Sequence, residues 1–183
     1  MISRAALSAL LPVVVAGALA GGTASASANE RDKRFFEQVT GEWSGPGEIV
    51  AGKYKGTKFN CTFKGATPQG KIGMSLDGGC RVGLFTQKMS ASVEHKGRQG
   101  YRGTFMDGAI GQGLDVIGGN VTGERVVLTL NRNQLNGAML AKMPSKDSLQ
   151  VTVSVKVDQQ MVPVIGMNLK RVEMRSVGSI AGN

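Results

Sequence analysis

Apolar and polar residues alternate along most of the chain beyond residue 41, with the period of two that is typical of β-strands. The clearest run is LQVTVSVKVD at residues 149–158, in which every second side chain from Leu149 to Val157 is apolar and the side chains between them are polar. Shorter runs of the same kind surround Cys61, Met74, Val93 and Leu128. Such strands have one buried face and one solvated face, which is typical of an antiparallel sheet.

Short stretches rich in Gly, Asn, Asp and Pro separate these runs, and they are interpreted as turns. They include TPQG at 67–70, LDGG at 76–79, IGGN at 117–120 and TGE at 122–124. Because no helical pattern alternates with the strands, the pattern predicts an all-β, antiparallel up-and-down barrel of about eight strands.

A helical pattern precedes the strands. In NERDKRFFEQVT, residues 29–40, the side chains of Phe35, Phe36 and Val39 form one apolar stripe on an otherwise polar segment. Gly41 follows directly and is typical of a helix end. We therefore expect a short helix over residues 29–40, a single barrel domain over 41–174 and a flexible tail over 175–183.

The first residues have the pattern of a secretory signal peptide. Arg4 precedes an almost wholly apolar run over residues 5–20, and small residues follow, with A-x-A cleavage options at 24–26 and 26–28. The apolar run is shorter than the roughly 20 residues that a membrane-spanning helix needs. We expect residues 1–28 to be removed on export, which predicts a periplasmic or secreted protein with no transmembrane segment in the mature chain.

Basic residues outnumber acidic ones. The chain has 22 Lys and Arg against 13 Asp and Glu, a formal net charge of +9. These basic residues are scattered and do not cluster with aromatic side chains, which argues against nucleic-acid binding. An anionic envelope component or an acidic protein partner fits the charge better, and ordinary solubility is the alternative that needs no partner.

The only two cysteines are Cys61 and Cys80. An even number of cysteines in an exported protein favours a disulfide. If LDGG is a turn, the strand at residues 71–76 lies between the two cysteines along the chain. The bridge is then expected to pass that strand or to staple a loop over the end of the barrel.

No catalytic constellation is recognisable in the sequence. His95 is the only histidine, and no G-x-S-x-G motif or metal-ligand spacing accompanies it. A haem or metal ligand at a barrel mouth is one interpretation of His95, and an exposed histidine at the edge of a loop is the favoured one. We therefore expect no enzymatic activity, no metal site and no cofactor.

Larger apolar residues on the inner faces of the strands are candidates to line a ligand cavity, because small barrels often hold one small molecule. A plain packed core is the alternative for each of them. The candidates are Phe59, Phe63, Met74, Met89, Val93, Tyr101, Phe105, Leu128, Met139, Val153 and Met167.

Gly41-x-Trp43 at the head of the first strand and Arg171 near the end of the last resemble the calycin superfamily, which includes lipocalins, fatty-acid-binding proteins and avidins. In that superfamily the tryptophan plugs one end of the barrel and a basic residue from the last strand lies across its ring. The resemblance assigns these roles to Trp43 and Arg171, with Lys170 as the weaker candidate for the basic residue. It implies a non-enzymatic protein that holds a small apolar or amphipathic ligand.

The order of Gly41-x-Trp43, Cys61 and Cys80 is also similar to that of bacterial periplasmic metalloprotease inhibitors. Those inhibitors plug a protease cleft with an extended mature N-terminus, which here would be residues 29–33. This second resemblance implies, as the alternative function, a protease inhibitor or an envelope-associated protein-interaction module.

Overall fold

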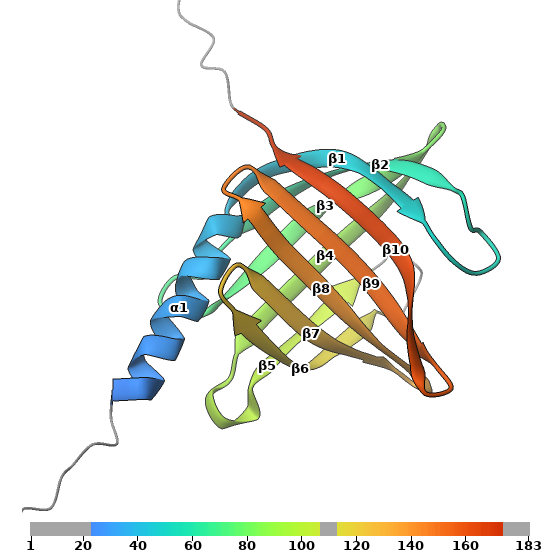
Figure 1. Ribbon diagram of the computed structural model, residues 1–183. Helices are drawn as coiled ribbons and strands as arrows, with labels where there is room; N and C mark the ends of the chain where they lie inside the picture. Colours follow the sequence, from blue (N-terminus) through green and yellow to red (C-terminus); the bar gives the residue numbers. More distant parts are fainter. Residues whose placement is uncertain (1–22, 107–112, 174–183) are drawn as a thin grey trace, which may run out of the picture.

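The computed structural model describes residues 23–106 and 113–173. One α-helix is followed by ten strands in this part of the chain (Figure 1). The elements are α1 Thr23–Val39, β1 Gly41–Ile49, β2 Lys58–Ala66, β3 Gly73–Val82, β4 Phe85–His95, a 3₁₀ turn Gly97–Gln99, β5 Tyr101–Met106, β6 Leu114–Thr122, β7 Arg125–Arg132, β8 Leu135–Ser145, β9 Ser148–Val157 and β10 Gln160–Arg171.

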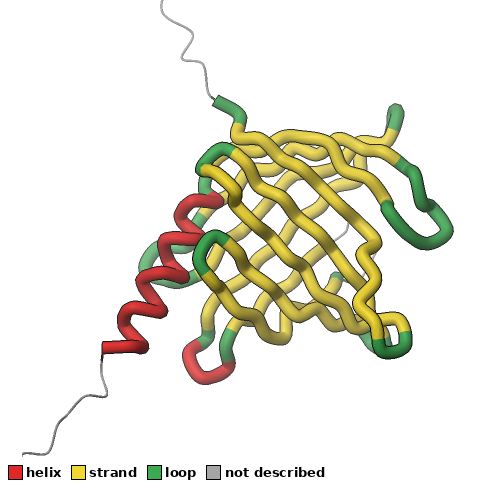
Figure 2. Tube along the Cα trace, in the orientation of Figure 1, coloured by secondary structure: helices red, strands yellow, loops and turns green. Residues whose placement is uncertain are grey.

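The strands form a closed antiparallel barrel in which each strand pairs with the next one along the chain (Figure 2). β10 closes the barrel by pairing with β1, and this pairing sets Arg171 opposite Trp43. The prediction of an all-β, antiparallel up-and-down barrel is confirmed. The predicted number of about eight strands is wrong, because the described residues form ten.

Two glycine pairs that were interpreted as turns lie inside strands. Gly78 and Gly79 belong to β3, and Gly118 and Gly119 belong to β6. None of the four has the positive φ of a tight turn, whereas Gly83, with a φ of 58°, does and joins β3 to β4. At Gly78 an added Cβ would lie 2.0 Å from the carbonyl oxygen of Thr62, so this glycine allows β2 to approach closely.

Strands β6 and β8 have a weak sequence signal, for two different reasons. In β6 a register shift between Val116 and Gly118 changes which residues point inward, so the buried Val116 and Val121 break the period of two. In β8 the alternation is regular, but two of its buried positions are Gly137 and Ala141, which add little hydrophobicity to the pattern.

Helix α1 begins at Thr23, six residues earlier than the expected start at residue 29, and it lies across one end of the barrel (Figure 1). Its predicted stripe of Phe35, Phe36 and Val39 is buried against the barrel. Cleavage after Ala28 would therefore fall inside this helix and leave the stripe in place. Within the described residues, no helix is long and apolar enough to cross a membrane. The expected tail, residues 175–183, lies outside the described residues.

Candidate ligand-binding site

Trp43 closes the barrel at the end that carries α1. Its side chain is fully buried, with 0% exposure, at the head of β1. The indole Nε1–H donates a hydrogen bond of 2.8 Å to the carbonyl oxygen of Val39, in the last turn of the helix. The one polar group of this large apolar side chain is thus paired, so its burial has no unsatisfied donor.

Arg171 covers the outer side of this plug. The centre of its guanidinium lies 4.3 Å from the centre of the Trp43 ring, within the range of a cation–π contact. Its Nη1 and Nη2 donate to the carbonyl oxygens of Thr40 and Gln38 at 2.6 and 2.7 Å. Cations at a helix C-terminus pair favourably with such carbonyl groups, so Arg171 fixes both the ring and the helix end.

Gly41 completes this group for a steric reason. Its φ is 121°, and an added Cβ would lie 2.6 Å from Nη1 of Arg171. A side chain at this position would therefore be strained and would displace the guanidinium. The three residues that carry the calycin resemblance, Gly41, Trp43 and Arg171, lie together in the structure as the resemblance predicts.

Inside the barrel, beneath the plug and the helix, lies an apolar cavity of about 50 Å³. Eight of the eleven predicted lining residues contribute to its wall: Phe63, Met74, Met89, Val93, Phe105, Leu128, Met139 and Met167. Four of these are methionines, whose unbranched side chains adapt readily to a changed volume.

The other three predicted lining residues lie elsewhere. Phe59 is half-buried against Gly47, and Val153 is buried in the core, away from the cavity wall. Tyr101 is buried beneath the helix, where its ring packs against Phe36. The period of two predicts that all three face the barrel interior. It does not predict at which position along the barrel axis the side chains leave a cavity.

Several cavity residues were missed by the sequence analysis. Phe35 and Val39 line the cavity from α1. Their apolar stripe predicts that this face of the helix is buried, but it does not predict which residues the helix contacts. Leu149 and Val151 were visible in the strongest alternating run of the chain. The remainder are Leu76, Ser90, Ala91, Ser92, Thr104, Val116, Ala141 and Leu169.

A polar contact fastens the helix to the barrel beside the cavity. The Tyr101 hydroxyl donates a hydrogen bond of 2.6 Å to Oδ2 of Asp32. Burial, and then the hydrogen bond to the Asp32 carboxylate, raise the pKa of Tyr101 well above its ordinary value. The phenol therefore stays protonated in the folded protein where an exposed tyrosine would ionise.

Removing this hydroxyl with Tyr101→Phe should lower the free energy of unfolding by about 1.5–3 kcal/mol, the range for a hydrogen bond to a charged group. Because the folded-state pKa of Tyr101 is raised, its contribution is complete below pH 10, the ordinary tyrosine pKa, and is lost as the pH rises above that value. Denaturant unfolding of both proteins should show that the difference between their free energies of unfolding is smaller at pH 11 than at pH 7. A constant difference would contradict the assignment.

His95 lies at the end of β4 next to the same contact. Its ring centre is 5.1 Å from that of Tyr101, and its side chain is half-buried. Among the described residues, no three His, Cys, Asp or Glu side chains gather closely enough to hold a metal ion. The geometry at His95 is that of a packed residue at the edge of a loop.

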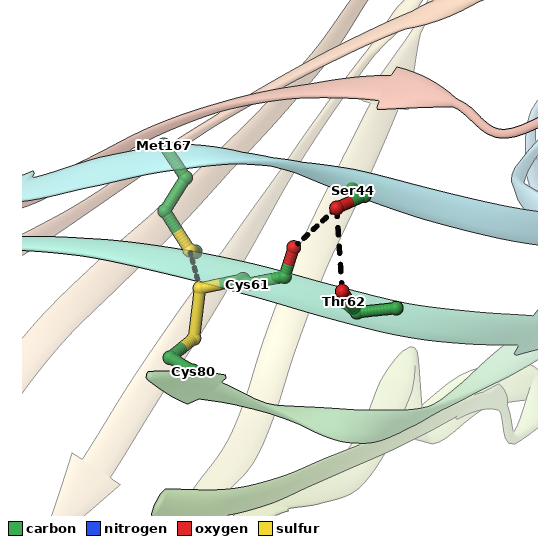
Figure 3. Close-up of a disulfide and its surroundings, with 5 residues drawn as sticks. All are labelled: Ser44, Cys61, Thr62, Cys80 and Met167. Carbon is green, nitrogen blue, oxygen red and sulfur yellow. Dashed lines mark hydrogen bonds between the residues drawn. A yellow bond between two sulfur atoms is a disulfide. The ribbon is translucent and has the colours of Figure 1, made fainter. Parts of the chain in front are cut away.

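Cys61 and Cys80 form a disulfide between adjacent strands, β2 and β3 (Figure 3). The two residues are direct register partners with Cα atoms 4.0 Å apart, so the expected intervening strand does not exist. The segment LDGG is part of β3, and β3 runs antiparallel to β2, so Cys80 lies directly opposite Cys61. The Cys61 sulfur also contacts the Met167 sulfur at 3.8 Å, which brings the bridge against a residue of the cavity wall.

Comparisons with known proteins give information about the fold of this chain but not about its function. No protein-family model and no curated protein matches this sequence. A solved structure, that of Rv2717c from M. tuberculosis, is similar with a TM-score of 0.56 at 13% sequence identity, over 78% of this chain and 98% of that chain. At this identity the similarity shows a shared barrel fold alone.

Proposed function

We propose that this protein is an exported, non-enzymatic binding protein whose barrel holds one small apolar molecule. The observation that carries the proposal is the apolar cavity inside the barrel, which Phe35 and Val39 of α1 line on the side of the helix. A periplasmic or secreted location is part of the proposal, and the disulfide and the leader-like residues 1–28 support it.

The size of the cavity limits what it accepts. A cavity of about 150 Å³ admits benzene, whereas this one measures about 50 Å³. A ligand larger than a few heavy atoms therefore requires the walls to move. The four methionines among the predicted lining residues are the side chains best able to do so, since each turns about three flexible bonds.

The inhibitor alternative has less support. Residues 29–33, which would form the extended plug of such an inhibitor, lie within α1. In this conformation their backbone is paired within the helix and is not presented as an extended strand to a protease cleft.

Ligand binding is tested by native mass spectrometry of the protein purified from its own producing cells. We expect the wild-type protein to retain a small apolar molecule at a ratio of one per chain. Ala141→Leu adds a bulky group in the cavity wall and should reduce the retained fraction at least tenfold. Ala66→Leu makes the same change on the exposed surface of β2 and should retain the molecule as the wild type does.

Overpacking can also unfold a barrel, so circular dichroism of Ala141→Leu must match the wild type. Thermal unfolding with benzene is an independent measurement. Met139→Ala enlarges the cavity, so saturating benzene should raise the melting temperature of this variant by more than that of the wild type. An absence of any retained molecule, together with no benzene effect in Met139→Ala, would overturn the proposal.

A further inference from the structure

At the end of the barrel opposite α1, several large apolar side chains are exposed. Leu84 and Phe85, at the tip of the β3–β4 hairpin, are 97% and 83% exposed. Val82 beside them and Tyr54 and Val50 in the β1–β2 connection are also exposed. Several large apolar side chains exposed at one end of a molecule commonly mark an interaction site.

The hairpin projects beyond the barrel wall (Figure 1). The pairing of β2 with β3 ends at Asn60 and Arg81, and the pairing of β4 with β5 begins only at Ser90. Val82 and Phe85 are register partners at the tip, so they lie on the same face of the hairpin. These side chains therefore add nothing to the barrel core, and their exposure is not needed to close the barrel.

Basic residues outnumber acidic ones around this tip, where Glu48 is the register partner of Lys58 and Asp77 lines a hollow together with Lys88. Residues 50–58 and 81–88, which we call the mouth surface, contain five basic residues and no acidic residue: Lys53, Lys55, Lys58, Arg81 and Lys88. All five are exposed. At the helix end of the barrel, by contrast, basic side chains pair with acidic ones, as in the contacts of Glu94 with Lys71 and Lys96 and of Asp147 with Arg171.

We propose that the mouth surface docks on an anionic lipid membrane, with Leu84 and Phe85 entering the interface and the surrounding lysines and arginine contacting the headgroups. Exposed apolar side chains with cations on the same end of the barrel favour binding at an anionic interface, and Tyr54 is of a residue type enriched at that depth. The tip itself presents only Val82, Leu84 and Phe85 as large exposed apolar side chains, whereas a stable protein interface involves about 20–30 residues on each partner. The proposal does not depend on a ligand in the cavity.

The experiment measures co-sedimentation of the purified exported protein with phosphatidylglycerol vesicles and with phosphatidylcholine vesicles. The processed N-terminus is verified by mass, because a retained apolar leader would itself bind lipid. We expect at least tenfold tighter binding to the anionic vesicles, since each basic residue near such a surface strengthens binding about fivefold.

Two double variants and two matched controls locate the contact. Leu84→Ser with Phe85→Ser, and Lys53→Gln with Lys55→Gln, should each weaken binding at least tenfold. Lys64→Gln with Lys142→Gln removes the same charge from exposed positions on the barrel wall, and Ile117→Ser removes an exposed apolar side chain there. Both controls should bind within about threefold of the wild type.

Equal binding to both kinds of vesicle, or wild-type binding by the two mouth variants, would overturn the proposal. So would a failure to bind anionic vesicles combined with a crosslink from position 84 to a protein of the producing cell. That result would assign the mouth surface to a protein partner.

Discussion

Replacing Trp43 with alanine should lower the free energy of unfolding by about 3–5 kcal/mol, the range for truncating a buried aromatic side chain. The side chain is 0% exposed, so nearly all of its apolar surface is removed from water in the folded state. The change also leaves the Val39 carbonyl without its indole donor and the Arg171 guanidinium without its ring. Urea unfolding followed by circular dichroism gives the difference directly.

Two control variants separate these contributions. Trp43→Phe keeps an aromatic face under Arg171 but removes the N–H donor, so it should cost less than Trp43→Ala. Tyr54→Ala truncates an aromatic side chain that is 64% exposed, and it should change stability by no more than about 0.5 kcal/mol. If Trp43→Ala came within about 1 kcal/mol of the wild type, the plug would not hold the helix end of the barrel together.

The sequence pattern predicts the barrel where strands are regular and fails where the backbone departs from the ideal. The run at 149–158 falls on strand β9, Ser148–Val157, where Leu149, Val151 and Val153 are buried as the pattern predicts, while Val157 near the strand end is 50% exposed. Gly78 and Gly79 look like a turn in the sequence, yet they are strand residues, because two adjacent glycines permit a turn without requiring one. The sign of φ, which separates the two cases, depends on the neighbouring strands and not on the residues themselves.

The candidate site was predictable to the extent that it depends on single strands. Phe63, Met74 and Val93 face inward because of their place in an alternating run, and they line the cavity. Phe35 and Val39 reach the same cavity through the docking of α1, a tertiary contact that no local pattern describes. The mouth surface also depends on tertiary structure. Residues 80–85, CRVGLF, have the composition of a buried strand, and only the pairing of neighbouring strands shows that their tip extends beyond both β2 and β5.

Breaking the Cys61–Cys80 bridge should lower the free energy of unfolding by about 2–5 kcal/mol. The two residues are 19 positions apart, and a loop of this length restricts the unfolded chain by about 3 kcal/mol in the chain-entropy account. Cys61→Ala and Cys80→Ala also remove buried volume, because Cys61 is 0% and Cys80 6% exposed.

Comparing oxidised and reduced wild-type protein separates the loss of the bridge from the loss of buried volume, because reduction leaves both side chains in place. The oxidised form should be the more stable by the stated amount, and a double variant with both cysteines replaced by alanine should not respond to reductant. Thiol titration of the unfolded, unreduced protein should find no reactive thiol. Two reactive thiols per chain would show that the bridge does not form in the producing cell, and the β2–β3 pair would then be held by its backbone ladder and by core packing, for example of Phe63 and Met74.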